Sequence, residues 1–389
     1  MKRSRLAAVL LATPLVALPA ATGAANAAPS EPSAPMVAVQ KAAPGQAVQG
    51  SYIVTLKSGV TAKSLTRAKG LNTQYVYSKV FNGFAAKLTA GQLSALRANP
   101  SVQAIEENQK ATVSGTQNGA TWGLDRIDQR NRPLDSTYTW NRDGAGVTAY
   151  IIDTGLDSRH ADFGGRAQNV YNSVGGSGED CHGHGTHVGG TVGGNAYGVA
   201  KGVALRGVKV LGCDGSGSFA GIIAGFDWVR ANAAKPAVAN ASLGGGYSAA
   251  VNTAAANLAN SGVHLSVAAG NDNRDACNYS PASASSVLTV AASDSSDRKA
   301  SFSNYGRCVE TYAPGVSIAS ARMGGGSTSM NGTSMASPHA AGVAALYKAN
   351  NGDASSATIN SWVTSNATPN VITGNVTGTP NRLLFKAGL

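Results

Sequence analysis

The sequence predicts an α/β protein with a mostly parallel central sheet flanked by helices, preceded by a small α+β unit. From Trp122 onward, short apolar runs alternate with helix-like segments, a pattern typical of parallel sheets covered by helices. Residues 50–114 show strand-like and helix-like segments in a different order. Apolar residues make up 43% of the 389 residues and charged residues only 13%, which supports a large core and excludes a disordered chain.

The small unit has the order β-α-β-β-α-β. Strand-like alternation covers residues 51–57, 74–80, 84–88 and 101–106, and helix-like spacing covers residues 61–69 and a segment from the cap Thr89 to Ala98. This order is that of a ferredoxin-like split βαβ unit. A unit of only 65 residues (50–114) buries little surface, so we expect it to be marginally stable.

The large unit is expected to hold its functional site at one edge of its sheet. Apolar strands are expected at residues 147–152, 205–211, 238–243, 263–268 and 287–292, and helices at 221–232 and 249–261. In open parallel sheets, ligands bind beyond the carboxyl ends of the strands. Functional residues should therefore follow these apolar runs.

The N-terminus has the features of a signal peptide over residues 1–27. Lys2, Arg3 and Arg5 precede an apolar stretch, and the small residues Ala-Asn-Ala at 25–27 suit cleavage. The apolar stretch is too short to span a bilayer, so we expect a secreted, extracellular protein without a membrane segment. Residues 28–49 are rich in Ala, Pro, Ser and Gln and are expected to be a linker.

The net charge of +11 lies mainly in the N-terminal part of the chain. Residues 1–114 contain 12 Lys and Arg against 3 Glu, whereas residues 115–389 contain 19 Lys and Arg against 17 Asp and Glu. The larger part offers no electrostatic footprint for a phosphate backbone, so we expect no nucleic-acid partner. No heptad pattern predicts assembly, so we expect a monomer.

The four cysteines predict disulfides. They are Cys181, Cys213, Cys277 and Cys308. An even number of cysteines in an exported chain indicates two disulfides, and composition leaves three pairings open. A metal site is less favoured because no C-x-x-C pair occurs.

Two segments of the large unit place a chemically active side chain at the end of an element. Asp153 closes an apolar strand, where a buried carboxylate needs a partner, although by itself it fits an ordinary strand end. Ser334 precedes small and apolar residues that predict a buried helix to about Lys348. Near the start of that helix it would lie close to free backbone N–H groups, although a simple helix cap is the commoner role.

A third segment is rich in histidine. His182, His184 and His187 lie within six residues. The cluster fits either a zinc site or one general base at the start of a helix. Against zinc, no H-E-x-x-H frame is present, and the surrounding glycines predict a tight turn.

Together these segments supply a catalytic triad. A serine hydroxyl becomes a nucleophile when a base removes its proton, and a carboxylate orients that base and stabilises its charged form. The chain order Asp153, His184, Ser334 is the order found in subtilisin.

The chain resembles the subtilisin-like serine proteases (peptidase S8 type), and among them the proteinase K and aqualysin group. The motifs that carry the resemblance are DTG at 153–155, HGTH at 184–187 and GTSMASPH at 332–339. The resemblance extends from about Gly115 to Leu389 and implies a subtilisin-like catalytic domain over residues 115–389. Residues 50–114 resemble the inhibitor-type propeptide of the family.

The resemblance implies a role for each residue of the site. His184 is the base, His187 is structural and His182 has no assigned role, which leaves no catalytic metal. Asn271, in AAGN, matches the oxyanion-hole asparagine of the family, although Gly270-Asn271 alone fits an ordinary turn. The implied activity is that of a serine endopeptidase that acts through an acyl-enzyme.

Two glycine-rich segments resemble the strand edges that flank an extended peptide substrate in this family. One contains Gly217 and Phe219, and the other contains Ser242, Leu243 and Gly244. Backbone pairing tolerates many sequences, and Leu243 and Phe219 are expected to line the P1 and P4 pockets, respectively. We could assign no Asp to the floor of the P1 pocket, so we expect broad specificity with an apolar or aromatic P1 residue preferred.

The resemblance also implies a disulfide pairing and a structural metal. The cysteine spacing is similar to that of aqualysin, with the pairs Cys181–Cys213 and Cys277–Cys308. The family binds structural calcium, and the matching ligands are the carbonyls of Ser285 and Val287 and the carboxylate of Glu310. Oxygen ligands suit calcium.

The two units together indicate a self-processing zymogen. In the family, the propeptide assists folding and inhibits the protease, and alignment of the WGL segment places the cut near Ser114–Gly115. The expected partners are protein and peptide substrates and the chain's own propeptide.

Two other classes of protein compete with the protease interpretation. A binding or inhibitory protein on the same fold would usually lack a triad residue or Asn271, and a nucleotide-binding enzyme would need a glycine-rich phosphate motif between strand and helix, which we do not find.

Overall fold

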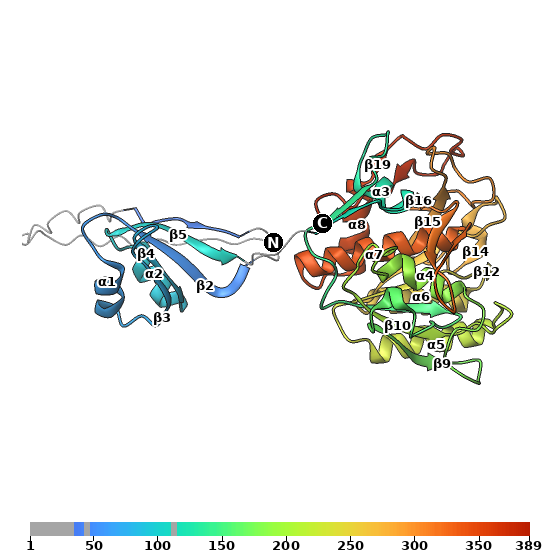
Figure 1. Cartoon of the computed structure of the whole chain (residues 1–389), viewed down its shortest axis with the longest axis horizontal. Coiled ribbons are helices and arrows are strands. Elements are labelled where there is room, and N and C mark those ends of the chain that lie inside the picture. Colours follow the sequence, from blue (N-terminus) through green and yellow to red (C-terminus); the bar gives the residue numbers. More distant parts are fainter. Residues whose placement is uncertain (1–34, 43–46, 110–114) are drawn as a thin grey trace, which may run out of the picture.

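The computed structural model describes residues 35–42, 47–109 and 115–389. The expected signal peptide and Ser114, at the expected cut, lie outside these ranges. The described residues form two bodies, which appear as two separate ribbons in Figure 1. Within these ranges, no helix is both long and apolar enough to cross a membrane.

The N-terminal body is a five-stranded sheet with two helices. Its elements are β1 (Val39–Gln40), β2 (Ala47–Leu56), α1 (Ala62–Ala68), β3 (Thr73–Tyr77), β4 (Gly83–Lys87), α2 (Ala90–Arg97) and β5 (Val102–Gln109). The strand order is β1-β5-β2-β4-β3, and its last four strands have the predicted ferredoxin-like order. Strand β1 lies in the stretch expected to be a linker. It pairs in parallel with β5, and Val39 packs against the small core, so the linker is shorter than expected.

A mostly parallel sheet of nine strands forms the centre of the C-terminal body, which confirms the predicted fold class. The order is β19-β20-β16-β15-β13-β11-β8-β10-β9. The strands are β8 (Thr148–Asp153), β9 (Ala167–Asn172), β10 (Ala204–Lys209), β11 (Ala237–Ala241), β13 (His264–Ala268), β15 (Leu288–Ser293), β16 (Thr311–Pro314), β19 (Thr368–Pro369) and β20 (Arg382–Leu383). Smaller pairs are β6 (Gly115–Asn118) with β7 (Thr137–Trp140), β12 (Gly245–Gly246) with β14 (Tyr279–Ser280), and β17 (Ile318–Ala321) with β18 (Ser327–Met330).

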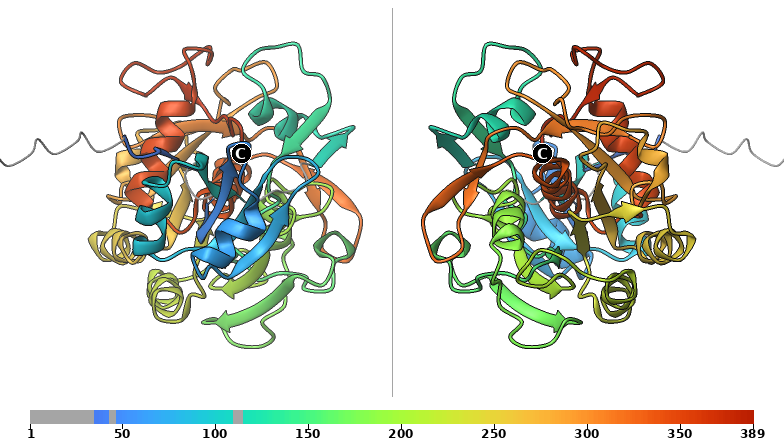
Figure 2. Two further views of the ribbon diagram at one scale, coloured as in Figure 1. Left: turned by 90° about the vertical axis from the view of Figure 1, so that its left-hand side faces the viewer. Right: turned by 90° about the vertical axis from the view of Figure 1, so that its right-hand side faces the viewer.

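Helices cover both faces of this sheet. They are α3 (Trp122–Asp128), α4 (His184–Gly193), α5 (Phe219–Asn232), α6 (Ala249–Asn260), α7 (Thr333–Asn351) and α8 (Ser356–Asn366), with short 3-10 turns at Ala161–Phe163 and Ala276–Asn278. Because side chains alternate along a strand, Ile151 of β8 joins the core under α4 and α7, whereas Ile152 joins the core under α5 and α6. Figure 2 shows α5 and α6 nearly end-on, beside each other.

Candidate active site

The predicted catalytic residues lie at the ends of neighbouring elements. Asp153 is the last residue of β8, His184 is the first residue of α4, and Ser334 is the second residue of α7. Asn271 follows β13 after Gly270, whose φ of 102° favours glycine. The carboxyl ends of the parallel strands therefore bring together residues that are far apart in the sequence.

Asp153 and His184 form a hydrogen-bonded pair. Asp153 is fully buried, and its Oδ1 lies 2.7 Å from His184 Nδ1 and also accepts the Thr154 N–H at 2.7 Å. Burial opposes the charged imidazolium, but the charge of Asp153, its hydrogen bond and the charge of Asp180 together raise the pKa of His184. The pair thus leaves Nε2 of His184 as the atom that can accept a proton from a nucleophile.

The turn before His184 is organised by Asp180, which the sequence analysis missed. Asp180 Oδ1 accepts the backbone N–H groups of His182 and Gly183 at 2.9 Å each, and Oδ2 accepts the N–H and hydroxyl of Thr186. Burial alone would raise the pKa of Asp180, but these hydrogen bonds lower it. The signal in the sequence was weak, because an Asp before a glycine-rich turn is also a common capping residue.

Thr154 connects the two carboxylates. Its N–H donates to Asp153, and its hydroxyl donates to Asp180 Oδ1 at 2.9 Å and accepts the Gly185 N–H at 2.9 Å. A single residue thus fixes both the strand end that carries the acid and the helix start that carries the base.

Ser334 lies in the first turn of α7, where backbone N–H groups have no partner within the helix. Its side chain is half-buried. Its Oγ donates to the Ser242 carbonyl at 3.2 Å, and Ser242 Oγ donates to the Ser334 carbonyl at 2.8 Å. These two bonds join the start of α7 to the segment that follows β11, and they give the hydroxyl a partner other than His184.

Asn271 is held by the residue before Ser334. Its Oδ1 accepts both the backbone N–H and the hydroxyl of Thr333 at 2.9 Å. Because the oxygen is occupied in this way, the amide nitrogen is the atom that Asn271 can offer to a ligand.

Two adjoining cavities run along these residues. One, of about 450 Å³, is lined by His182 and His184 and by all five predicted substrate-binding residues, Gly217, Phe219, Ser242, Leu243 and Gly244. The other, of about 260 Å³, is lined by Asn271, Ser334 and apolar residues such as Ala268. Leu243 and Gly244 line both cavities, so together they form one extended cleft. We had placed no Asp at the P1 pocket, but the exposed Asp272 also lines the second cavity.

The other two histidines of the cluster lie in different surroundings. His187 is fully buried, its Nε2 lies 2.9 Å from the Ile318 carbonyl, and burial lowers its pKa to about 4. His182 is exposed and lies in the cleft with its ring centroid 6.3 Å from that of His184. His187 therefore holds β17 and β18 against α4 rather than facing the cleft.

The structure contains both disulfides with the pairing that the resemblance implies. Cys181–Cys213 and Cys277–Cys308 have Cα separations of 4.9 Å and 5.3 Å. The first joins the turn before His184 to the loop after β10, which forms a wall of the cleft. The second joins the segment after β13 to the segment before β16. The first disulfide thus ties together two loops at the carboxyl edge of the sheet.

The three residues expected to bind calcium lie just before two neighbouring strands. Ser285 and Val287 precede β15, and Glu310 precedes β16, which pairs with β15. Glu310 Oε2 accepts the Thr289 N–H at 2.6 Å, and burial raises the pKa of Glu310 to about 7. A buried carboxylate that is costly to ionise beside backbone carbonyls fits a hard cation. In the described ranges, no three His, Cys, Asp or Glu side chains are grouped so that they could hold a metal; the expected site has only one such side chain.

Comparisons with known proteins agree with this geometry. The model of the Subtilase family matches residues 144–388, and the model of Peptidase inhibitor I9 matches residues 51–114. The extracellular serine proteinase of Thermus sp. (strain Rt41A) is 50% identical over 321 residues, which cover 82% of this chain and 78% of that protein. Alkaline serine exoprotease A of Vibrio alginolyticus is 48% identical over 84% of this chain, and the match spans 63% of its length. The crystal structure of a cold adapted subtilisin-like serine proteinase is 51% identical with a TM-score of 0.68, covering 69% of this chain and 99% of that one.

A carboxylate, an imidazole and a serine at the carboxyl edge of a parallel sheet define the class of serine hydrolases. Within that class, the chain belongs to the subtilase family of serine proteases. A peptidase inhibitor I9 segment precedes its protease unit. The family and the enzyme class predicted from the sequence are thereby confirmed.

Proposed function

We propose that the chain is the zymogen of a secreted serine endopeptidase with the triad Asp153, His184 and Ser334. The observation that carries this proposal is the 2.7 Å contact between His184 and the buried Asp153, at a cleft that Ser334 and Asn271 also line. The carboxylate is in contact with the imidazole, and the serine hydroxyl lies at the adjoining cavity. Extracellular relatives such as the Thermus enzyme support export through the expected signal peptide.

The chemistry follows from the proton positions. His184 Nε2 takes the proton of Ser334 as Oγ rotates away from Ser242 and attacks the scissile carbonyl. The Ser334 N–H and the amide of Asn271 donate to the oxyanion that forms. The imidazolium then protonates the leaving amine, and water releases the acyl group by the same route in reverse. The buried charge of Asp153 stabilises the imidazolium throughout.

Substrate selection would come from backbone pairing and one apolar pocket. A peptide would lie between the segments around Gly217 and Leu243, with its P1 side chain in the cavity lined by Ala268. This arrangement favours broad specificity with an apolar or aromatic P1 residue. The exposed Asp272 at the edge of the same cavity would let the P1 residue vary. A peptide-library digest dominated by Arg or Lys at P1 would contradict this preference.

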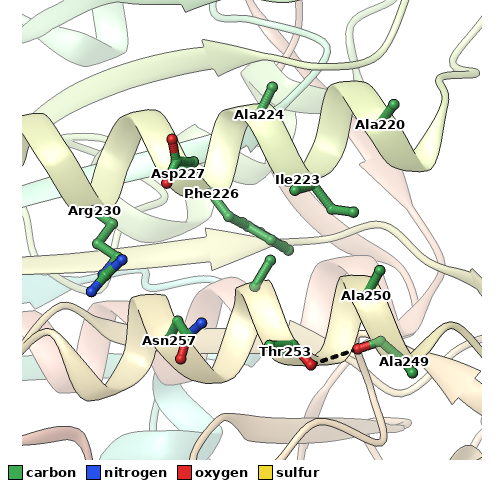
Figure 3. Close-up of a pocket in the computed structure, with 11 residues that line it drawn as sticks. Ala220, Ile223, Ala224, Phe226, Asp227, Arg230, Ala249, Ala250, Thr253 and Asn257 are labelled. Atoms are coloured by element: carbon green, nitrogen blue, oxygen red, sulfur yellow. Dashed lines mark hydrogen bonds between the residues drawn. The ribbon is translucent and has the colours of Figure 1, made fainter.

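The propeptide would dock on a groove between α5 and α6. Figure 3 shows the groove, with Ile223 and Phe226 on one helix and Ala250 and Thr253 on the other. Helix α5 begins at Phe219, which lines the cleft, and α6 follows the cleft residue Gly244 after the short strand β12. The I9 unit exposes large apolar side chains to match it: Tyr75, Val76, Val80 and Phe81 are 67%, 47%, 83% and 38% exposed. Exposed apolar surface of this kind marks an interaction site.

A matched pair of substitutions tests the docking surface. Ala250 and Ala357 are both exposed alanines at the second position of a helix, and only Ala250 lines the groove. Ala250→Arg should weaken inhibition by added propeptide at least about 10-fold, the effect of losing roughly 1.4 kcal/mol. Ala357→Arg should leave the inhibition constant unchanged. Equal constants for the two variants would rule out this groove.

Calcium would bind at the Ser285 and Val287 carbonyls and Glu310. A ligand that binds only the folded state at 100 times its Kd adds about 2.7 kcal/mol of stability. Chelator should therefore lower the Tm of the wild type, and Glu310→Gln should remove most of that sensitivity. A chelator-insensitive Tm in the wild type would end the calcium proposal.

Intact masses give the decisive test of the whole proposal. The wild type and Ser334→Ala would be made in the same protease-deficient host. A wild type near the mass of residues 115–389, beside an uncut variant, is the expected result. Equal processing of both chains would show that another protease makes the cut, and would favour an inactive protein on the same fold.

A further inference from the structure

A buried lysine with no assigned role lies on the strand next to the one that carries the proposed catalytic acid. Lys209 ends β10 and is opposite Asp153 in the parallel pairing with β8. It is 2% exposed. Its Nζ donates to the Thr154 carbonyl at 2.6 Å and lies 3.6 Å from Cys181 Sγ. It thus contacts both the residue that follows the acid and the turn that carries the base.

This ammonium shares its counter-charges with His184. Burial lowers the pKa of Lys209, and the charges of Asp180 and Asp153 oppose that shift. The same two carboxylates raise the pKa of His184. Lys209 forms no ion pair among the described residues, so these longer-range interactions are the ones that compensate its charge. The four groups form one electrostatic cluster.

We propose that Lys209 is a positioning residue for the proposed triad. Its ammonium fixes the Thr154 carbonyl and offsets the two carboxylates that would otherwise favour a protonated His184. It acts through Thr154, whose other polar atoms bind Asp153 and Asp180, and it touches no reacting atom. The inference rests on the triad under Proposed function.

The charge balance gives the physical reason. With neutral His184, the cluster of Asp153, Asp180 and Lys209 carries a net charge of −1. When the imidazole takes the Ser334 proton, the net charge becomes zero. Without Lys209 the two values would be −2 and −1, so the imidazolium would be stabilised before substrate arrives, and less of the enzyme would hold the neutral base.

Other titratable groups lie near the same imidazole. His182 lies in the same turn, His187 lies on the next turn of α4, and Asp214 follows β10 and interacts with His182. None of them changes in the variants below, so their effect is common to all profiles.

The test is the pH dependence of kcat/KM for one peptide substrate, measured on the matured enzyme. Lys209→Gln keeps a hydrogen-bond donor and removes the charge, Lys209→Met removes both, and Lys209→Arg keeps the charge. Lys348→Met is the control for the loss of a buried lysine, because Lys348 also donates to a backbone carbonyl, that of Gly262 at 2.7 Å, far along α7 from Ser334. Unlike Lys209, it also pairs with a carboxylate, that of Asp353 at 2.6 Å.

Removing the charge should move the acid limb of the profile to higher pH by roughly 0.5 to 1 unit, from one charge at an intermediate dielectric. At a pH on that limb, kcat/KM relative to its own plateau would fall about 3- to 10-fold. Lys209→Arg and Lys348→Met should keep the limb of the wild type. A limb that stays in place in Lys209→Gln, or that moves equally in Lys209→Arg, would overturn the proposal.

A second measurement uses the uncut chain, so it does not depend on self-processing. In the uncut Ser334→Ala chain, the His184 imidazole titration can be followed by NMR with and without Lys209→Gln. An upward shift in the variant supports the role of Lys209, and identical titrations refute it. Failure of the triad itself is distinguishable, because hydrolysis would then persist in Ser334→Ala.

Discussion

Each of the two bodies of this chain is stabilised by a different set of internal interactions. The N-terminal unit relies on a core of ten buried apolar side chains and exposes Tyr75 and Val80 to solvent. The protease unit has three buried clusters, both disulfides and a continuous polar network around Asp153 and His184. All four cysteines and all six histidines lie in the protease unit.

Because of this difference, the interactions that stabilise the small unit are separate from those that position the proposed catalytic residues. The small unit leaves apolar surface that only a partner can cover, so its stability should depend on docking. The protease unit fixes its acid and base through bonds within itself, chiefly at Thr154 and Asp180. The small unit can therefore leave after maturation without taking any part of the proposed site with it.

The largest expected effect tests whether activity belongs wholly to the protease unit. Asp153→Asn keeps the shape of the carboxylate but removes the charge that orients His184, so kcat should fall about 10⁴-fold, as for such a change in a serine protease. Glu107→Gln is the control in the small unit, because Glu107 pairs with the exposed Lys41 and accepts the Ala42 N–H, both within that unit. Steady-state hydrolysis checks both variants, and a loss of less than about tenfold in Asp153→Asn would contradict the assigned role.

The next effect tests the difference in stability. Leu96 of α2 and Leu346 of α7 are both buried leucines on helices, 1% and 0% exposed. Truncation to Ala should cost each unit about 2–5 kcal/mol. That loss should unfold the marginal I9 unit, whereas the protease unit should keep its fold.

Urea unfolding of the uncut Ser334→Ala chain separates the two transitions. Leu96→Ala should abolish the earlier transition, and Leu346→Ala should only lower the later one. If the earlier transition survives in Leu96→Ala as the later one does in Leu346→Ala, the small unit is more stable than we expect.

The sequence was enough to predict the fold and the places of the proposed catalytic residues at the ends of its elements. Apolar runs marked all five central strands, because strands buried on both faces need continuous apolar residues. The strand-end position of Asp153 and the helix-start position of Ser334 also follow from local pattern. The structure places them as predicted, although the roles of these residues remain proposals.

Features that depend on packing between distant segments could not be predicted. Strand β1 lies in an Ala- and Pro-rich stretch and forms because β5 offers it a free edge. Asp180 and Lys209 look ordinary in the sequence, and their importance depends on the three-dimensional neighbours Thr154 and Asp153. Asp272 reaches the cleft because the loop after β13 turns back at Gly270. In each case the deciding contact joins residues that no local pattern connects.

A smaller effect concerns the stability of the fold at acid pH. Protonation of buried histidines should lower that stability only in the protease unit. His264 is fully buried, its Nε2 lies 2.9 Å from Asn360 Oδ1, and burial lowers its pKa to about 4 from 6.5. A neutral buried histidine stabilises the fold above pH 6.5, and this contribution is lost as the pH falls toward 4. The loss can reach about 3 kcal/mol.

Urea midpoints at pH 7 and 4.5 check this in the Ser334→Ala chain. His264→Gln should flatten the pH dependence of the later transition in part, since His187 and His339 also have pKa values lowered by burial to about 4. The earlier transition should show no histidine-dependent slope. A pH dependence unaltered by His264→Gln would contradict the prediction.

The smallest effect compares one helix cap in each unit. Thr89 accepts the Gln92 N–H at 3.3 Å at the start of α2, and Ser355 accepts the Thr358 N–H at 3.2 Å at the start of α8. Substitution by Ala should cost either unit about 1 kcal/mol. The midpoint shift equals that cost divided by the m value, and m grows with the surface exposed on unfolding. Thr89→Ala should therefore move the early urea midpoint further than Ser355→Ala moves the late one. Equal shifts would mean that the two units expose similar surface when they unfold, so that the I9 unit unfolds together with part of the protease unit.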